Sequence, residues 1–137
     1  MKTPLIKTRI VLLLVSGAML ILVGSFIIVS PTDFYASNNI DLGSNVSLVN
    51  ELKAPAGLLL VAGLFMISAI FVQGKTDVAL WLAALIYLSY ASSRSVSMTI
   101  DGVPATGLVQ ATLLEATIGL ACLVVLLVSR RPVRKVA

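Results

Sequence analysis

Several kinds of chemistry are excluded by residues that this chain lacks. Histidine is absent from its 137 residues, which removes the most common general base and the most common zinc ligand. Cysteine occurs once, as Cys122 in an apolar run, so one chain can form no disulfide and has no cysteine-based metal motif. We therefore expect no metal, no cofactor and no catalytic residues of the usual nucleophile and base types.

Charged residues are also scarce. They make up 12% of the chain, against about 25% in soluble domains, and hydrophobic residues make up 58%. So few charges cannot cover the surface of a soluble fold, and the composition predicts an integral membrane protein. The net charge of +4 does not indicate nucleic acid as a partner, because the basic residues cluster beside apolar segments. The expected partner is membrane lipid.

Four apolar segments are long enough to cross a bilayer, which takes about 20 helical residues. They predict helices over about residues 10–30, 54–73, 78–98 and 105–129. The third helix must continue past Arg94 to reach this length. The expected fold is all-α: a single domain over residues 1–137, an integral membrane antiparallel four-helix bundle with a short interfacial helix in the first outer loop.

The distribution of basic residues predicts the orientation. They precede the first apolar segment and follow the last one, at Lys2, Lys7, Arg9, Arg130, Arg131, Arg134 and Lys135. Four spans place both termini on one side, and positive charge favours the cytoplasmic side. We therefore predict a multi-pass protein of the bacterial inner (cytoplasmic) membrane with both termini cytoplasmic. The short link at residues 74–77 would then lie inside as well.

The first outer loop contains a helix signal of its own. Ser30 is followed by Pro31 and by an acid at Asp33, which resembles a capping box with proline at the first helical position. Phe34 and Tyr35 follow, as expected of a short helix at the level of the lipid headgroups. Residues 36–50 are predicted to form a polar loop.

Glu115 is the most informative residue, because it interrupts the last apolar segment. It lies 11 residues after Pro104, roughly 16 Å into the membrane. A carboxylate at that depth is costly and must face protein or water. Arg94 lies in the outer half of the third segment and can pair with it. Three roles stay open for Glu115: a structural ion pair, a ligand or proton site, and a contact to another membrane subunit.

Other polar residues gather in the same outer half. On the third helix they recur at spacings of three and four and so share one face. The predicted ligand-binding set is Glu51, Lys53, Tyr87, Tyr90, Arg94, Ser97, Asp101 and Glu115. The alternatives are that Arg94 only extends to the interface, that the tyrosines only pack, and that the remaining charges are solvated.

Two stretches carry a family resemblance. Residues 50–57, Asn-Glu-Leu-Lys-Ala-Pro-Ala-Gly, continue into the apolar run 58–63, and Arg94 is followed by Ser97 and by Asp-Gly-Val-Pro at 101–104. With Pro31, Phe34 and Tyr35, these residues resemble an uncharacterised bacterial four-helix membrane family, domain of unknown function 4345. The resemblance implies a fold and no activity. The chain departs from the expected pattern at Lys53, in place of arginine, and at Ala56, in place of glycine.

Three functions follow as hypotheses. The leading one is a non-catalytic binding or accessory membrane protein, whose outer polar pocket takes a lipid headgroup or small anionic ligand. The second is a small oligomeric proton-coupled transporter that uses Glu115. The third is a lipid-modifying enzyme, which the missing acid–base residues disfavour. A homo-oligomer and a larger membrane complex both stay open as protein partners.

Overall fold

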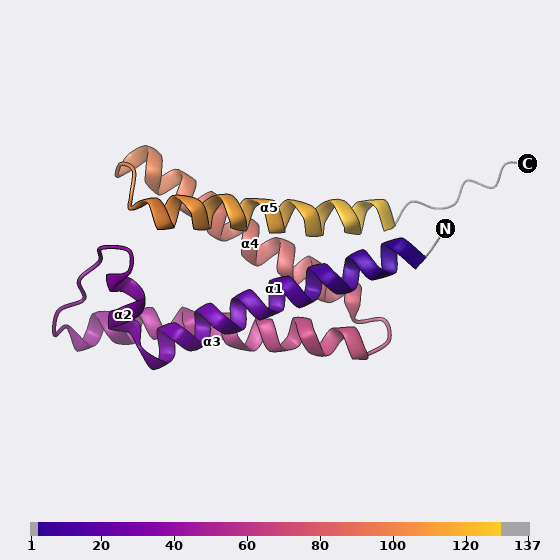
Figure 1. Cartoon of the computed structure of the whole chain (residues 1–137), viewed down its shortest axis with the longest axis horizontal. Helices are drawn as coiled ribbons and strands as arrows, with labels where there is room; N and C mark the ends of the chain where they lie inside the picture. The colour runs from indigo at the N-terminus through magenta and orange to yellow at the C-terminus, as the bar shows by residue number, and fades with distance from the viewer. Residues whose placement is uncertain (1–2, 130–137) are drawn as a thin grey trace, which may run out of the picture.

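The computed structural model describes residues 3–129. In this part of the chain five helices follow one another without a strand: α1 (Thr3–Val29), α2 (Pro31–Ala36), α3 (Val46–Phe71), α4 (Thr76–Ile100) and α5 (Thr106–Ser129). Figure 1 shows the four long helices in two pairs, with α1 lying along α3 and α4 lying along α5. The short α2 sits at the end of α1, beside the start of α3.

Glycine lets α1 and α3 approach closely. A Cβ atom built on Gly63 would lie 2.6 Å from the carbonyl oxygen of Gly17, and one built on Gly24 would lie 2.7 Å from the carbonyl oxygen of Ala56. Later residues of α1 therefore meet earlier residues of α3. Small residues at such positions allow helix backbones to pack in a membrane, where van der Waals contact replaces the hydrophobic effect. Gly17 and Gly24 are therefore packing positions in the contact between α1 and α3.

The second pair packs in a similar way. Gly119 of α5 faces Leu88 of α4, and a Cβ built on Gly119 would lie 2.7 Å from the Leu88 side chain. The two pairs join in a core at the crossing, where residues from all four long helices are fully buried: Leu13, Met66, Leu80, Cys122 and Leu126. Because α1 also contacts both α4 and α5, this core links the pairs.

The loop predicted over residues 36–50 is shorter than expected. α3 begins at Val46, because the Asn45 side chain accepts a hydrogen bond from the Leu48 amide at 3.0 Å and so caps the helix. The predicted start near residue 54 is therefore about two helical turns late. Pro55 lies inside α3, not at its first turn. It removes one backbone hydrogen bond there.

The predicted short helix is present as α2, with Pro31 in its first turn. Its start differs from a capping box. The Ser30 side chain makes no cap hydrogen bond to the backbone, and its hydroxyl donates to the Asp33 carboxylate instead. The serine and the acid thus bond to each other, so the first amides of α2 are left without a side-chain cap.

Three of the long helices are apolar enough to cross a membrane: α1 from Pro4, α3 and α5. Their outward faces carry large apolar side chains, such as Leu22, Leu58 and Leu113, each more than 60% exposed. Such faces are expected of a protein surrounded by lipid. The chain is therefore a helical membrane protein. α4 is not among the three, since its second half combines Arg94 with a run of serines.

Candidate functional site

A cavity of about 340 Å³ lies between the two helix pairs, at the end of the molecule that carries α2. All five helices contribute to its wall. The lining is mostly aliphatic or aromatic, with side chains such as Val23, Leu59, Ile86 and Leu114. Its polar members are six: Tyr35, Asn38, Tyr87, Tyr90, Arg94 and Glu115. This is the usual composition of a small-molecule site, in which a few polar groups orient a ligand within an apolar wall.

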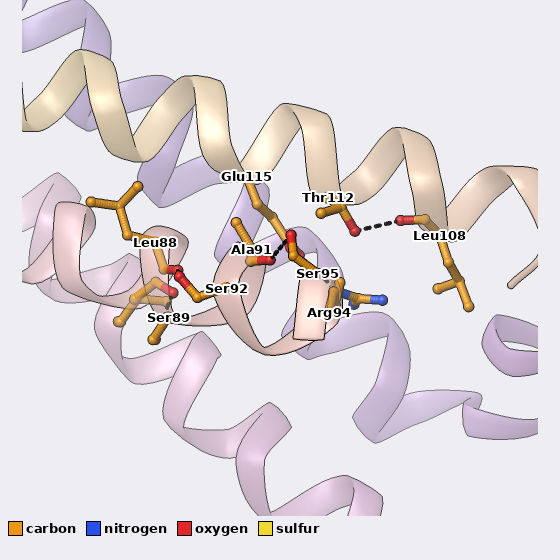
Figure 2. Close-up of polar contacts among 10 residues, drawn as sticks. Leu88, Ser89, Ala91, Ser92, Arg94, Ser95, Leu108, Thr112 and Glu115 are labelled. Atoms are coloured by element: carbon orange, nitrogen blue, oxygen red, sulfur yellow. Dashed lines mark hydrogen bonds and ion pairs between the residues drawn. The ribbon is translucent and has the colours of Figure 1, made fainter. Parts of the chain in front are cut away.

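An ion pair stands at the polar part of this wall. The Nε atom of Arg94 on α4 lies 3.3 Å from Oε2 of Glu115 on α5. Figure 2 shows Glu115 extending from α5 toward α4, where Arg94 is attached. The predicted pairing of these two residues is confirmed. The prediction rested on the length of the arginine side chain, which lets Arg94 in the outer half of α4 reach toward the deeper Glu115 on α5.

The two side chains are close enough to form an ion pair, but no hydrogen bond joins them. Both Nε of Arg94 and Oε2 of Glu115 are buried, yet neither makes a hydrogen bond within the described residues. The Glu115 side chain is 16% exposed and that of Arg94 is 32% exposed. Buried polar atoms normally have a hydrogen-bond partner. These two atoms face each other and have almost no accessible surface, so a ligand can reach the pair only through the other guanidinium and carboxylate atoms. Those other atoms make no hydrogen bond within residues 3–129 either, so a ligand group can contact them without displacing a protein partner.

Two phenols face the same space. Neither the Tyr35 hydroxyl on α2 nor the Tyr90 hydroxyl on α4 has a hydrogen-bond partner among residues 3–129. Burial raises the pKa of Tyr35 above its ordinary value of 10.0, Tyr90 raises it further, and Arg94 lowers it in part. Tyr35 therefore keeps its proton at neutral pH and can donate it in a hydrogen bond.

Residues between α2 and α3 close the end of the cavity. Asn38 lines the wall, and its side-chain oxygen lies 2.5 Å from where a Cβ on Gly107 would stand. Glycine at the start of α5 thus lets this loop come close. The sequence placed Tyr35 only at headgroup level and did not single out Asn38 or Gly107. Their role depends on a loop folding back over helices distant in sequence, which no local pattern reveals.

Tyr87 serves a different contact from the one predicted. Its hydroxyl donates to the backbone carbonyl of Ser16 on α1 at 2.8 Å. The ring borders the cavity, but the hydroxyl is already engaged. Behind it, the hydroxyl of Ser16 lies 3.8 Å from the sulfur of Cys122. These contacts connect α1, α4 and α5 inside the core.

The remaining predicted site residues do not line the cavity. Glu51 is exposed and Lys53 is half-buried on the first turns of α3. Ser97 donates to the Asp101 carboxylate at 2.8 Å, at the end of α4. Ser97 lines an open groove on the outer face of α4, together with Tyr90 and Arg94. The predicted set is thus divided between the cavity, this groove and solvent, and a ligand role for these four residues stays a prediction.

A second ion pair lies at the opposite end of the molecule. Arg9 of α1 pairs with Asp77, in the first turn of α4. The sequence assigned Arg9 only to topology and Asp77 only to a tight link. The structure shows that these two charges join the start of α1 to the start of α4. The basic residues at 130–135 lie outside the described residues.

No group of three or more metal-ligating side chains occurs within the part of the chain that the structure describes. The site therefore rests on an apolar cavity, an ion pair and hydroxyl donors. Such a set can hold an amphiphilic molecule and orient its polar end.

The family model for a domain of unknown function (DUF4345) matches residues 8–126. The chain belongs to this family. The match covers all five helices almost completely, so the cavity, its ion pair and the α2 segment all lie within the family domain. No curated protein and no solved structure matches the chain.

Proposed function

We propose that this member of the family is a non-catalytic binding or accessory protein, which holds a lipid-like ligand in the cavity beneath α2. One observation carries the proposal: a mostly apolar cavity of about 340 Å³ is lined by the Arg94–Glu115 pair, whose side chains make no hydrogen bond within residues 3–129. An apolar wall suits a hydrocarbon tail. The ion pair suits a polar head, which would otherwise lose its hydrogen bonds on leaving water.

The proposed setting is the bacterial inner membrane, with α1, α3, α4 and α5 crossing as an antiparallel four-helix bundle. α4 has 25 residues, a length of roughly 37 Å, which is enough for a span. Its buried side is formed by small residues such as Ala79, Ala83 and Ala91, and Arg94 turns toward α5. A polar residue held in this way is tolerated in a spanning helix.

The proposed orientation places the cavity on the outer side and both termini in the cytoplasm. The start of α1 and the end of α5 lie at the same end of the molecule, opposite α2 (Figure 1). Lys7 and Arg9 are at that end, as the positive-inside rule requires. The Arg9–Asp77 pair adds support, because it brings the link before α4 to the same end.

Native mass spectrometry of the protein released from membranes tests the function. Wild type should retain a lipid-like mass. An Ala111→Phe variant should lose it, because Ala111 lines the cavity and a phenyl ring would occupy that space. Leu113→Phe is the matched control: it enlarges a residue two positions away that is 65% exposed on the outer face of α5. This control should keep the retained mass.

The outcomes separate the candidate functions. Loss of the retained mass in Ala111→Phe but not in Leu113→Phe supports a cavity-bound ligand, provided that both variants keep their helical circular dichroism. Equal retention in both variants would remove the binding function. Transport of a proton-coupled substrate that stops in Glu115→Gln, without any retained ligand, would favour the transporter hypothesis instead. Retention of a stoichiometric protein partner alone would favour an accessory subunit.

A further inference from the structure

The polar part of the cavity wall is rich in hydrogen-bond donors. The hydroxyls of Tyr35 and Tyr90 have no partner among residues 3–129, and Arg94 makes no hydrogen bond there through any of its nitrogens. A guanidinium has five N–H donors and no acceptor. The carboxylate of Glu115 is the main acceptor, and Arg94 already faces it. A ligand that satisfies this wall must therefore offer acceptor oxygens.

The charge of the wall is already balanced. Among the described residues that line the cavity, only Arg94 and Glu115 carry charge, and their facing atoms are 3.3 Å apart. A ligand with an anionic head would add a second negative charge beside Glu115. The single guanidinium of Arg94 could then neutralise only one of the two charges. Holding an unbalanced charge away from water is costly. An uncharged acceptor, such as a carbonyl oxygen, takes the free donors without that cost.

The volume of the cavity limits the size of the ligand's apolar tail. Ligand cavities range from about 300 to 1,000 Å³, and this one, at about 340 Å³, is near the lower limit. It has room for one hydrocarbon chain or a small ring system rather than a complete two-chain lipid. Leu59 and Ile86 belong to the apolar part of the wall that would contact this tail.

The geometry points to a specific ligand class: an amphiphile with one apolar chain or ring system and an uncharged head bearing carbonyl oxygens, such as an ester, ketone or quinone. The oxygen atoms of the head accept from Tyr90, Tyr35 and Arg94, while Glu115 neutralises the guanidinium. This inference rests on the proposed binding function. It assigns Glu115 a role in selectivity, because the carboxylate excludes anionic heads that Arg94 alone would attract.

A competition between two probes tests this class. Methyl palmitate has an uncharged ester head, and cetyl sulfonate has a tail of matched length and a head that stays charged at every working pH. Both are added at equal concentration to the full-length protein in neutral detergent micelles, and native mass spectrometry gives the ratio of the two complexes. Wild type should favour methyl palmitate. Tyr90→Phe, which removes one hydroxyl, should weaken ester binding roughly two- to tenfold.

The Glu115→Gln variant gives the more decisive test, because it removes the negative charge and keeps a side chain of similar shape. Arg94 is then unbalanced, so the preference should reverse toward cetyl sulfonate by roughly tenfold. A wild type that prefers the sulfonate, or a preference unchanged in both Glu115→Gln and Tyr90→Phe, would overturn the inference while leaving the binding function standing. If neither probe binds wild type, or if both bind Ala111→Phe as well as wild type, the binding function itself fails.

Discussion

The hydroxyl of Tyr87 donates a hydrogen bond to the backbone carbonyl of Ser16, across the contact between α4 and α1, at 2.8 Å. Both residues are buried. This bond joins the two helix pairs, because α1 belongs to one pair and α4 to the other. It lies next to the Ser16–Cys122 contact, so three helices meet at one small polar centre inside an apolar core.

Replacing Tyr87 by phenylalanine should lower the free energy of unfolding by about 0.6 kcal/mol, and at most by about 1.7, which is the range for polar contacts between membrane helices. The ring still fills its place in the core, so only the hydroxyl contact is lost. Thermal unfolding in detergent, followed by circular dichroism, measures the change. Tyr90→Phe is the control, since its hydroxyl has no partner within residues 3–129 and its loss should leave the ligand-free protein unaffected. Equal losses in both variants would contradict this account.

Gly63→Ala should destabilise the contact between α1 and α3 by about 1–3 kcal/mol, as overpacking does. The new methyl group would lie 2.6 Å from the Gly17 carbonyl oxygen, a backbone atom that cannot move alone. Gly57→Ala is the matched control in the same helix, because a Cβ there meets nothing within 4 Å. Alanine is the better helix former, so the control should be neutral or stabilising by up to about 1 kcal/mol. Thermal unfolding of both variants, compared with wild type, measures these two changes in stability.

Arg94→Met should destabilise the protein by about 1–3 kcal/mol, since it leaves Glu115 largely buried without its counter-charge. The double variant with Glu115→Gln removes both charges. It should recover part of that loss, because no lone charge is left behind. The unfolding free energies of the two single variants and the double variant form a thermodynamic cycle that gives the coupling. A coupling near zero would mean that the pair does not contribute to the fold.

Cysteine labelling tests the proposed orientation. Cys122 is fully buried and should not react. The new cysteines are placed in a Cys122→Ser background, so that any labelling comes from them alone. A cysteine at Ser44, in the exposed loop before α3, should react with an impermeant maleimide on intact cells. A cysteine at Lys75, between α3 and α4, should react only after the cells are permeabilised. The opposite pattern would place both termini outside.

Some of the site could be predicted because it depends on depth along a helix. Glu115 and Arg94 were expected to meet because a carboxylate deep in the membrane needs a partner, and a long arginine side chain in the outer half of the next helix can reach inward to it. The close helix contacts at Gly17, Gly24 and Gly119 obey an equally local rule, because small residues let neighbouring helix backbones approach. Both arguments use only helix geometry and the cost of burying polar groups.

Other features could not be predicted, because they depend on segments that meet only after folding. The start of α3 at Val46 was not predicted, because the polar residues of the segment 36–50 are typical of a loop. Asn45 caps the helix within that segment. The contact of Asn38 with Gly107 requires the loop after α2 to fold over α5. The Arg9–Asp77 pair joins residues that are adjacent only once α1 and α4 are side by side.

The sequence by itself determined that this is a helical membrane protein with no histidine and a single cysteine. That conclusion follows from composition and from the length of uninterrupted apolar runs, which are local properties. Only the tertiary structure decided which polar groups share one cavity. The rotation of each helix and the crossing of the two pairs bring Tyr35 and Tyr90 beside Arg94 and Glu115, and leave Glu51 and Asp101 exposed. These angles come from the packing of side chains on different helices, which no single segment specifies.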